Sequence, residues 1–165
     1  MHVAELTNLE AKLSEVIGLA MAAQGATDKV KKLPELENEL EQKLTRMHEE
    51  AKQTEERATQ VASSFEGKKT AILDEARDVK QKATEMMQDY LDRASDALDG
   101  FEFLTMAEAG EVGHWEILRT LNERARNHEL QELVDWAIPI QQRHLDEVRQ
   151  GSLQLAASED PNESS

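Results

Sequence analysis

Apolar residues recur three and four positions apart along most of the chain, which is the spacing of one face of an α-helix. The pattern predicts three helices and then a hairpin of two more, over residues 3–23, 34–64, 70–98 and 101–150. Gly25, Gly67 and Gly100 lie at the breaks, and glycine readily adopts the left-handed conformation that ends helices. No stretch alternates apolar and polar residues as a half-buried strand would. We therefore predict an all-α fold without a sheet.

The helices are of comparable length and their connections are short. This favours an antiparallel four-helix bundle over an extended coiled-coil assembly. Residues 28–33 would add a short helix or helical turn, and Pro34 suits the first position of the second helix, where its missing N–H has no partner. We expect one domain over residues 1–155 and a disordered acidic tail over residues 156–165.

The apolar positions of the second helix follow a nearly strict heptad: Leu33, Leu36, Leu40, Leu44, Met47, Ala51, Thr54, Ala58 and Val61. A sustained heptad is typical of left-handed, coiled-coil-like packing against a neighbouring helix. We therefore expect a homodimer that pairs through this helix.

Two polar pairs interrupt the apolar faces of the hairpin. The first arm carries Glu111 and His114, and the second arm carries Gln141 and His144. The arms meet near residues 127–128, and residues equidistant from the turn of an antiparallel hairpin lie level with each other. His114 is then opposite Gln141, and Glu111 is opposite His144. We expect all four groups to meet at one level, roughly 20 Å from the turn.

A Glu-x-x-His pair projects a carboxylate and an imidazole in the same direction, as metal-carboxylate bundles require. Two imidazoles and one carboxylate can hold a single Fe, Mn or Zn ion and leave coordination positions open. Neighbouring carboxylates one turn away could be additional ligands or orient the first ones. The candidate metal ligands are therefore Glu111, His114, His144, Gln141, Glu108 and Glu147.

The same polar residues could instead form a buried hydrogen-bonded layer that fixes the helix register and binds nothing. Gly110 and Gly113 lie inside the first arm, where each costs about 1 kcal/mol relative to Ala. Close helix contact or room for a ligand would compensate. Pro139 leaves a backbone carbonyl without its usual donor and predicts a kink near Gln141.

Composition limits the partners. The chain has 34 acidic and 19 basic residues and a formal net charge of -15, which disfavours nucleic acids and anionic membranes. It has no cysteine, and therefore no disulfides or thiolate metal sites. The amino terminus lacks the layout of a signal peptide, and the longest apolar run, VIGLAMAA, is too short to span a bilayer. We expect a cytoplasmic protein without nucleic-acid or membrane partners.

Three segments carry a family resemblance: EEAKQTEERATQV (residues 49–61), VGHWEILRTL (112–121) and IQQRHLDEV (140–148). With the helix order, they make the chain similar to the ferritin-like superfamily, and most similar to the YciF-type bacterial stress proteins. The resemblance implies a ferritin-like four-helix bundle with a non-haem di-metal carboxylate site, iron or oxygen chemistry, and dimerisation.

The chain departs from the family pattern at ligand positions. Ala51 and Thr54 stand where the second helix of the family supplies a carboxylate and a His. Gly113 replaces the carboxylate before the His, and Gln141 replaces a Glu. Too few carboxylates remain to neutralise two divalent ions, so we expect a single-ion or degenerate site.

Two functions follow from these observations. The first is a metal-binding protein of stress response or iron handling. The second is a non-catalytic scaffold or protein-interaction bundle that has lost the metal site. The sequence contains no nucleophile–base arrangement and no phosphate-binding loop, so catalysis without a metal is not predicted.

Overall fold

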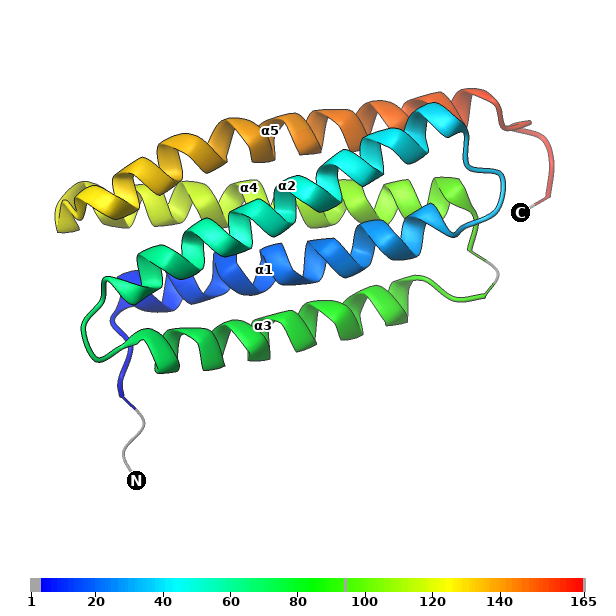
Figure 1. Cartoon of the computed structure of the whole chain (residues 1–165). Coiled ribbons are helices and arrows are strands. Elements are labelled where there is room, and N and C mark those ends of the chain that lie inside the picture. Colours follow the sequence, from blue (N-terminus) through cyan, green and yellow to red (C-terminus); the bar gives the residue numbers. More distant parts are fainter. Residues whose placement is uncertain (1–3, 94, 165) are drawn as a thin grey trace.

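The computed structural model describes residues 4–93 and 95–164 and contains five helices (Figure 1). They are α1 (Asn8–Lys31), α2 (Asn38–Ser63), α3 (Lys69–Tyr90), α4 (Ala97–Ala125) and α5 (His128–Ala157). No strand occurs among the described residues. The all-α class is confirmed, and α3, with 22 residues, corresponds to the helix expected over residues 70–98.

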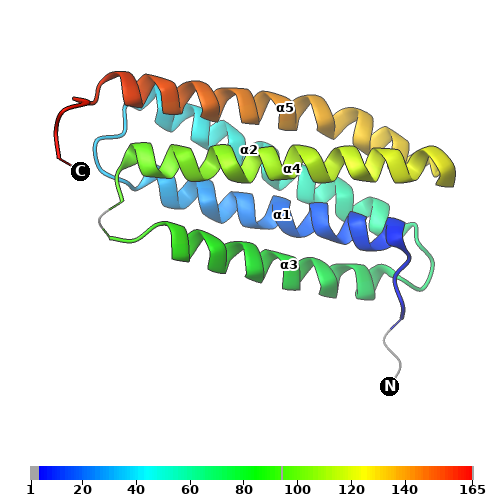
Figure 2. The ribbon, with the colours of Figure 1, turned by 180° about the vertical axis from the view of Figure 1, so that it is seen from behind.

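Successive helices run in opposite directions along a common axis (Figure 1). Helix α1 packs against α2, α3 and α4, and α5 packs against α4 and α2. Helix α3 lies outside this group and packs mainly on α1. Figure 2 shows α4, α1 and α3 side by side, with α1 in the middle.

The apolar core consists of two clusters. One contains Trp115 and Leu118 of α4, and the other contains Phe101 and Leu104. The stretch of α4 between Leu104 and Trp115 places polar side chains in the middle of the bundle. Burial of each large apolar side chain stabilises the fold by about 1.5–3 kcal/mol, so these clusters fix the helices on both sides of the polar level.

Helix α1 is longer than the sequence pattern predicts. It continues through Gly25 to Lys31, so the expected end at Ala23 and the separate turn over residues 28–33 are wrong. Ala26 and Val30 extend the buried face of the helix. Their packing outweighs the modest cost of a glycine inside a helix.

Helix α2 begins at Asn38 rather than at Pro34, because Glu35 adopts a positive φ of 65° and keeps the connection in a turn. The face that was expected to join two copies is buried inside the single chain. Its buried residues are Leu40, Leu44, Met47, Ala51, Thr54, Ala58 and Ala62.

Helix α3 ends at Tyr90 and does not reach residue 98. Asp96 caps the next helix: its side chain accepts from Asp99 N at 2.9 Å, and Asp99 accepts from Asp96 N at 3.0 Å. Gly100 therefore lies in the first turn of α4 and does not end a helix. A Cβ at Gly100 would lie 2.6 Å from Leu33 Cδ1, so the glycine allows the α1–α2 connection to pack closely.

The hairpin turn lies where the sequence predicts it. Arg126 ends α4 in the left-handed conformation, with φ 54°, and the Asn127 side chain caps α5. Helix α5 passes through Pro139 as one continuous helix and ends at Ala157, beyond the expected residue 150.

Candidate binding groove and buried carboxyl pair

The buried face of α4 differs from the expected one by one position. Trp115, the largest core side chain, is only 1 % exposed and occupies the interior. Successive helix residues are rotated by about 100°, so His114 turns to the edge of α4 and leaves the core. From Leu104 onward, the buried residues of α4 are Leu104, Glu108, Glu111, Trp115, Leu118 and Asn122.

Glu108 and Glu111 form a pair of buried carboxyls, 2 % and 5 % exposed. Gln141 of α5 is buried beside them. With its amide nitrogen turned toward α4, Gln141 Nε2 donates to Glu111 Oε2 at 2.7 Å and to Glu108 Oε2 at 3.2 Å. The hairpin register predicts that Gln141 lies opposite His114. Gln141 instead contacts Glu111 and Glu108, about one and two turns before His114.

The pair is held in a partly protonated state. Burial raises the pKa of the Glu108 carboxyl to about 8. Burial, and then the neighbouring Glu108 carboxylate, raise the pKa of Glu111 well above its usual range. Two carboxylates that share one buried amide donor repel each other when both are charged. The pair therefore retains at least one proton at neutral pH.

His144 belongs to a different cluster, between α2 and α5. Its Nε2 donates to Glu50 Oε1 at 3.0 Å, and Arg143 donates to both Glu50 oxygens at 2.9 and 2.5 Å. Burial raises the pKa of Glu50, but the hydrogen bonds from Arg143 and His144 outweigh burial and bring the pKa below its usual value. Burial lowers the pKa of His144. The Arg143 guanidinium lies beside Glu50 and neutralises its carboxylate, as a metal ion bound there would do.

Glu147 lies at the edge of this second cluster. Its Oε1 is 3.9 Å from Arg143 Nη1, and its buried Oε2 lacks a hydrogen-bond partner within the described residues. Glu50 was not among the predicted site residues. It directly precedes Ala51, so the heptad spacing assigns it to the flank of the buried face. A charged residue beside small core positions was the signal that could have identified it.

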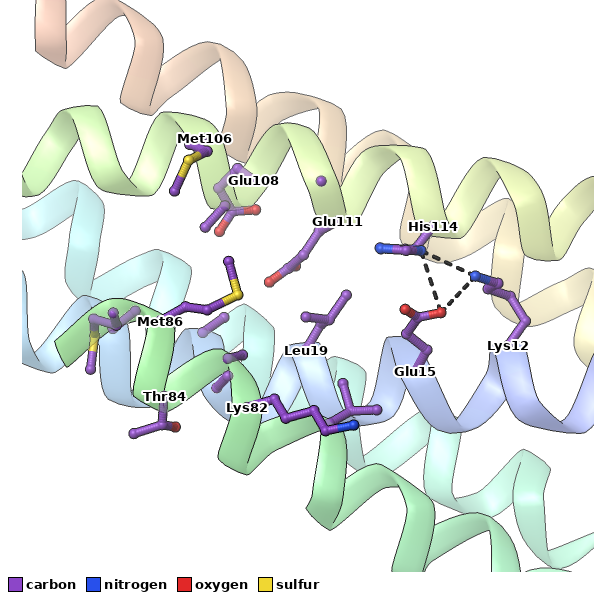
Figure 3. A pocket seen from close by; sticks show the side chains of 18 of the residues that line it. Lys12, Glu15, Leu19, Lys82, Thr84, Met86, Met106, Glu108, Glu111 and His114 are labelled. Atoms are coloured by element: carbon purple, nitrogen blue, oxygen red, sulfur yellow. Dashed lines mark hydrogen bonds and ion pairs between the residues drawn. The ribbon is translucent and has the colours of Figure 1, made fainter. Parts of the chain in front are cut away.

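His114 lies in a third place, against α1. Lys12 Nζ donates to His114 Nδ1 at 3.2 Å, and Glu15 Oε1 lies 3.5 Å from the same nitrogen (Figure 3). The side chain of His114 is 33 % exposed. Glu15 also pairs with Lys12, at 2.6 Å.

The six candidate ligands are thus divided among three places. Glu108, Glu111 and Gln141 form one group, His144 and Glu147 lie in the cluster around Glu50 and Arg143, and His114 lies against α1. Within residues 4–93 and 95–164, no group of three or more His, Asp or Glu side chains is arranged to hold a metal ion.

A groove of about 800 Å³ runs along α1 between α3 and α4. Small and apolar side chains supply most of its lining, and Met86 and Met106 are 60 % and 48 % exposed. Glu108 and Glu111 project into it from α4, and His114 lies toward one end (Figure 3).

Met86 and Tyr90 recur at helical spacing with the apolar residues of α3, which favours an interior position, but both are exposed, Tyr90 by 46 %. The signal was available in the excess of apolar residues on α3. One outer helix that packs on α1 cannot bury all of them.

Comparison with known proteins found no matching family model, no matching curated protein and no matching solved structure. No helix in the described part of the chain has the length and apolar character needed to cross a membrane.

Proposed function

We propose that this protein is a non-catalytic binding bundle that takes a ligand in the groove between α3 and α4. The observation that supports a binding function is the groove, which combines a volume of about 800 Å³ with an apolar lining and exposed methionines. Binding sites are typically concave and mostly apolar, with a few polar groups that orient the ligand. Glu108 and Glu111 supply such groups.

Two glycines of α4 provide a matched test. A Cβ at Gly110 or at Gly113 meets no atom within 4 Å, so a side chain can leave the backbone at either position without a clash. Gly110 lines the groove and Gly113 does not. Nile red, a neutral dye that fluoresces in apolar sites, should bind the native protein and the Gly113→Trp variant. Gly110→Trp should weaken dye binding at least tenfold, with both variants checked for native helicity.

The absence of dye binding to the native protein would contradict the groove proposal. Equal loss of binding in the Gly110→Trp and Gly113→Trp variants would also contradict it, since the dye would then bind elsewhere.

We also propose that α1, α2, α4 and α5 correspond to a ferritin-like four-helix bundle, with α3 as an outer addition. A ferritin-type two-metal centre does not fit these residues. His114 and His144 engage different helices, beside Lys12 and Arg143, and those cations disfavour a nearby metal ion.

A single divalent cation at Glu108, Glu111 and Gln141 is a second candidate. In the other orientation of the Gln141 amide, its oxygen would lie 2.7 and 3.2 Å from two carboxylate oxygens. Adjacent ligands of a small octahedral ion are about 3.0 Å apart when the metal–oxygen bonds are about 2.1 Å. Three oxygens this close repel one another unless a cation or a proton lies between them.

Metal titration separates the two orientations. Addition of Mn²⁺, Fe²⁺ or Mg²⁺ should raise the melting temperature of the native protein and not of the Glu111→Gln variant, and Mn²⁺ should give a bound-ion signal in electron paramagnetic resonance. A melting temperature that none of these ions changes would reject the metal candidate. It would leave Gln141 as the hydrogen-bond donor of a structural polar layer.

A further inference from the structure

The groove has the length of a helix. Its lining on α1 extends from Asn8 to Ala26, which corresponds to about 27 Å, or five helical turns. Helices α3 and α4 both pack along α1 and leave the face of α1 between them uncovered. A further helix in this position would contact all three and complete a second group of four around that face.

The groove surface suits a helix rather than a bulky compact ligand. Alanines line α1, and small residues also line both walls, where they permit close approach of another backbone. Methionines at the rims can adapt to varied side chains. The small lining residues are Ala11, Ala22, Ala23, Ala26, Ala83, Ala107 and Gly110.

The charges of the groove favour a basic occupant. Four carboxyls line it, from Glu15, Glu75, Glu108 and Glu111, against two ammonium groups, from Lys12 and Lys82. Lys12 already pairs with Glu15. In the described part of the chain, neither Glu108 nor Glu111 has a cationic neighbour within ion-pair distance, and their hydrogen-bond partner is the Gln141 amide.

We propose that the groove binds an amphipathic helix of a partner protein, with a Lys or Arg in the middle of its apolar face that pairs with Glu108 and Glu111. The inference rests on the proposed binding function of the groove. These carboxyls are already removed from water, so an incoming cation adds no new cost of dehydrating them, and it displaces a proton that the pair holds at neutral pH. The partner's own ammonium or guanidinium group does lose water.

Other helical occupants fit the charge less well. A second copy of this chain would bring a further net charge of -15 to an acidic surface. The segments before α1 and after α5, residues 1–7 and 158–165, contain no Lys or Arg.

The test uses two fluorescent helical peptides of about 18 residues, the length of the groove. Both have a Leu/Ala apolar face and a neutral outer face. One has Lys at the centre of the apolar face, and the other has norleucine, which removes the charge and keeps the chain length. Fluorescence anisotropy should show that the Lys peptide binds the native protein about tenfold more tightly, as expected for a charge-assisted hydrogen bond in a buried site.

The Glu108→Gln/Glu111→Gln variant should abolish this preference, because its amides keep the shape and lose the charge. The control is Glu102→Gln/Glu123→Gln, which changes two exposed residues of α4 outside the groove lining and should retain it. Thermal melts verify folding, and the single Glu111→Gln variant replaces the double one if that variant is unfolded.

Equal affinity for the two peptides would overturn the inference, since the groove would then recognise only apolar surface. Binding of Nile red without binding of either peptide would also overturn it and leave the proposed groove function intact. The absence of both would remove the proposed function as well. A dimer in sedimentation that Gly110→Trp dissociates and Gly113→Trp does not would assign the groove to a second copy instead.

Discussion

At the scale of single residues, the buried carboxyls of α4 should make stability fall as the pH rises. In the unfolded chain, Glu108 and Glu111 ionise near pH 4.5, whereas the folded protein holds the Glu108 proton to about pH 8. Between these values the folded state binds more protons, so the free energy of unfolding decreases with pH. We expect a decrease of up to about 1.4 kcal/mol per pH unit for each retained proton between pH 7 and 8. Urea unfolding across this range measures it.

The Glu108→Gln variant should show a smaller slope, because it removes one titrating group, and Glu102→Gln on the exposed face should show the native slope. The range avoids the contribution of His144, whose lowered pKa reduces stability only as the pH falls below about 6.5. Stability that is constant or increasing from pH 7 to 8 would contradict the buried, protonated pair.

The glycines of the helices should respond oppositely to substitution by alanine. Gly110 and Gly113 have open space at the Cβ position, so alanine should raise the free energy of unfolding by about 0.5–1 kcal/mol at each, through helix propensity alone. At Gly18 a Cβ would lie 2.4 Å from Ala76 O of α3, so alanine should destabilise. Equilibrium urea unfolding of the three variants tests this. A lower free energy of unfolding for Gly113→Ala would contradict the open space around the Cβ position of Gly113.

At the scale of helices, the ion pair between Glu50 and Arg143 joins α2 to α5. Glu50 and Arg143 form a two-point ion pair, with side chains only 15 % and 31 % exposed. A double-mutant cycle with Glu50→Ala and Arg143→Ala should give a coupling energy of about 1–2 kcal/mol. The exposed pair of Arg149 and Asp146 on α5, at 2.9 Å, should give less than about 0.5 kcal/mol. Equal coupling energies for the two pairs would contradict a stabilising role of the Glu50–Arg143 ion pair.

The helices were more predictable than their ends. Apolar spacing identifies a helix because the period is a property of the local chain. Its ends depend on contacts with other segments, which spacing does not contain. Val30 holds the last turns of α1 in the core, and Gly100 lies inside α4 because Asp96 and Asp99 form the cap that begins this helix.

The sequence predicts the height along the bundle at which the polar residues of the candidate site lie. It does not predict how α4 is rotated about its own axis. The spacing correctly indicated that polar residues interrupt the hairpin core near Glu111 and Gln141. The rotation depends on which neighbouring side chain fills the interior, and Trp115 occupies it in preference to His114. A rotation by one residue separates the two histidines, so the polar side chains that meet in the core could not be assigned from spacing alone.

At the scale of the whole molecule, α3 stands apart from the other helices. It is one wall of the groove, yet it packs mainly on α1 and buries only Ile72, Ala76 and Met87 fully. Segments with few buried apolar contacts open at lower free energy than the core. The width of the groove therefore depends on the least firmly held helix, which can adjust to an occupant without disturbing the packing between α4 and α5.

Hydrogen exchange should reveal this difference directly. We expect the amides of α3 to exchange faster than those of α5 near Ala137, which is buried in the core. The Gly18→Val variant should accelerate exchange in α3 while leaving α5 unchanged, because the added side chain would separate α3 from α1 at Ala76 and Val79. Equal protection of α3 and α5, or acceleration in all helices at once, would mean that the molecule opens as one unit. The groove would then be rigid, and occupants would have to fit its existing shape.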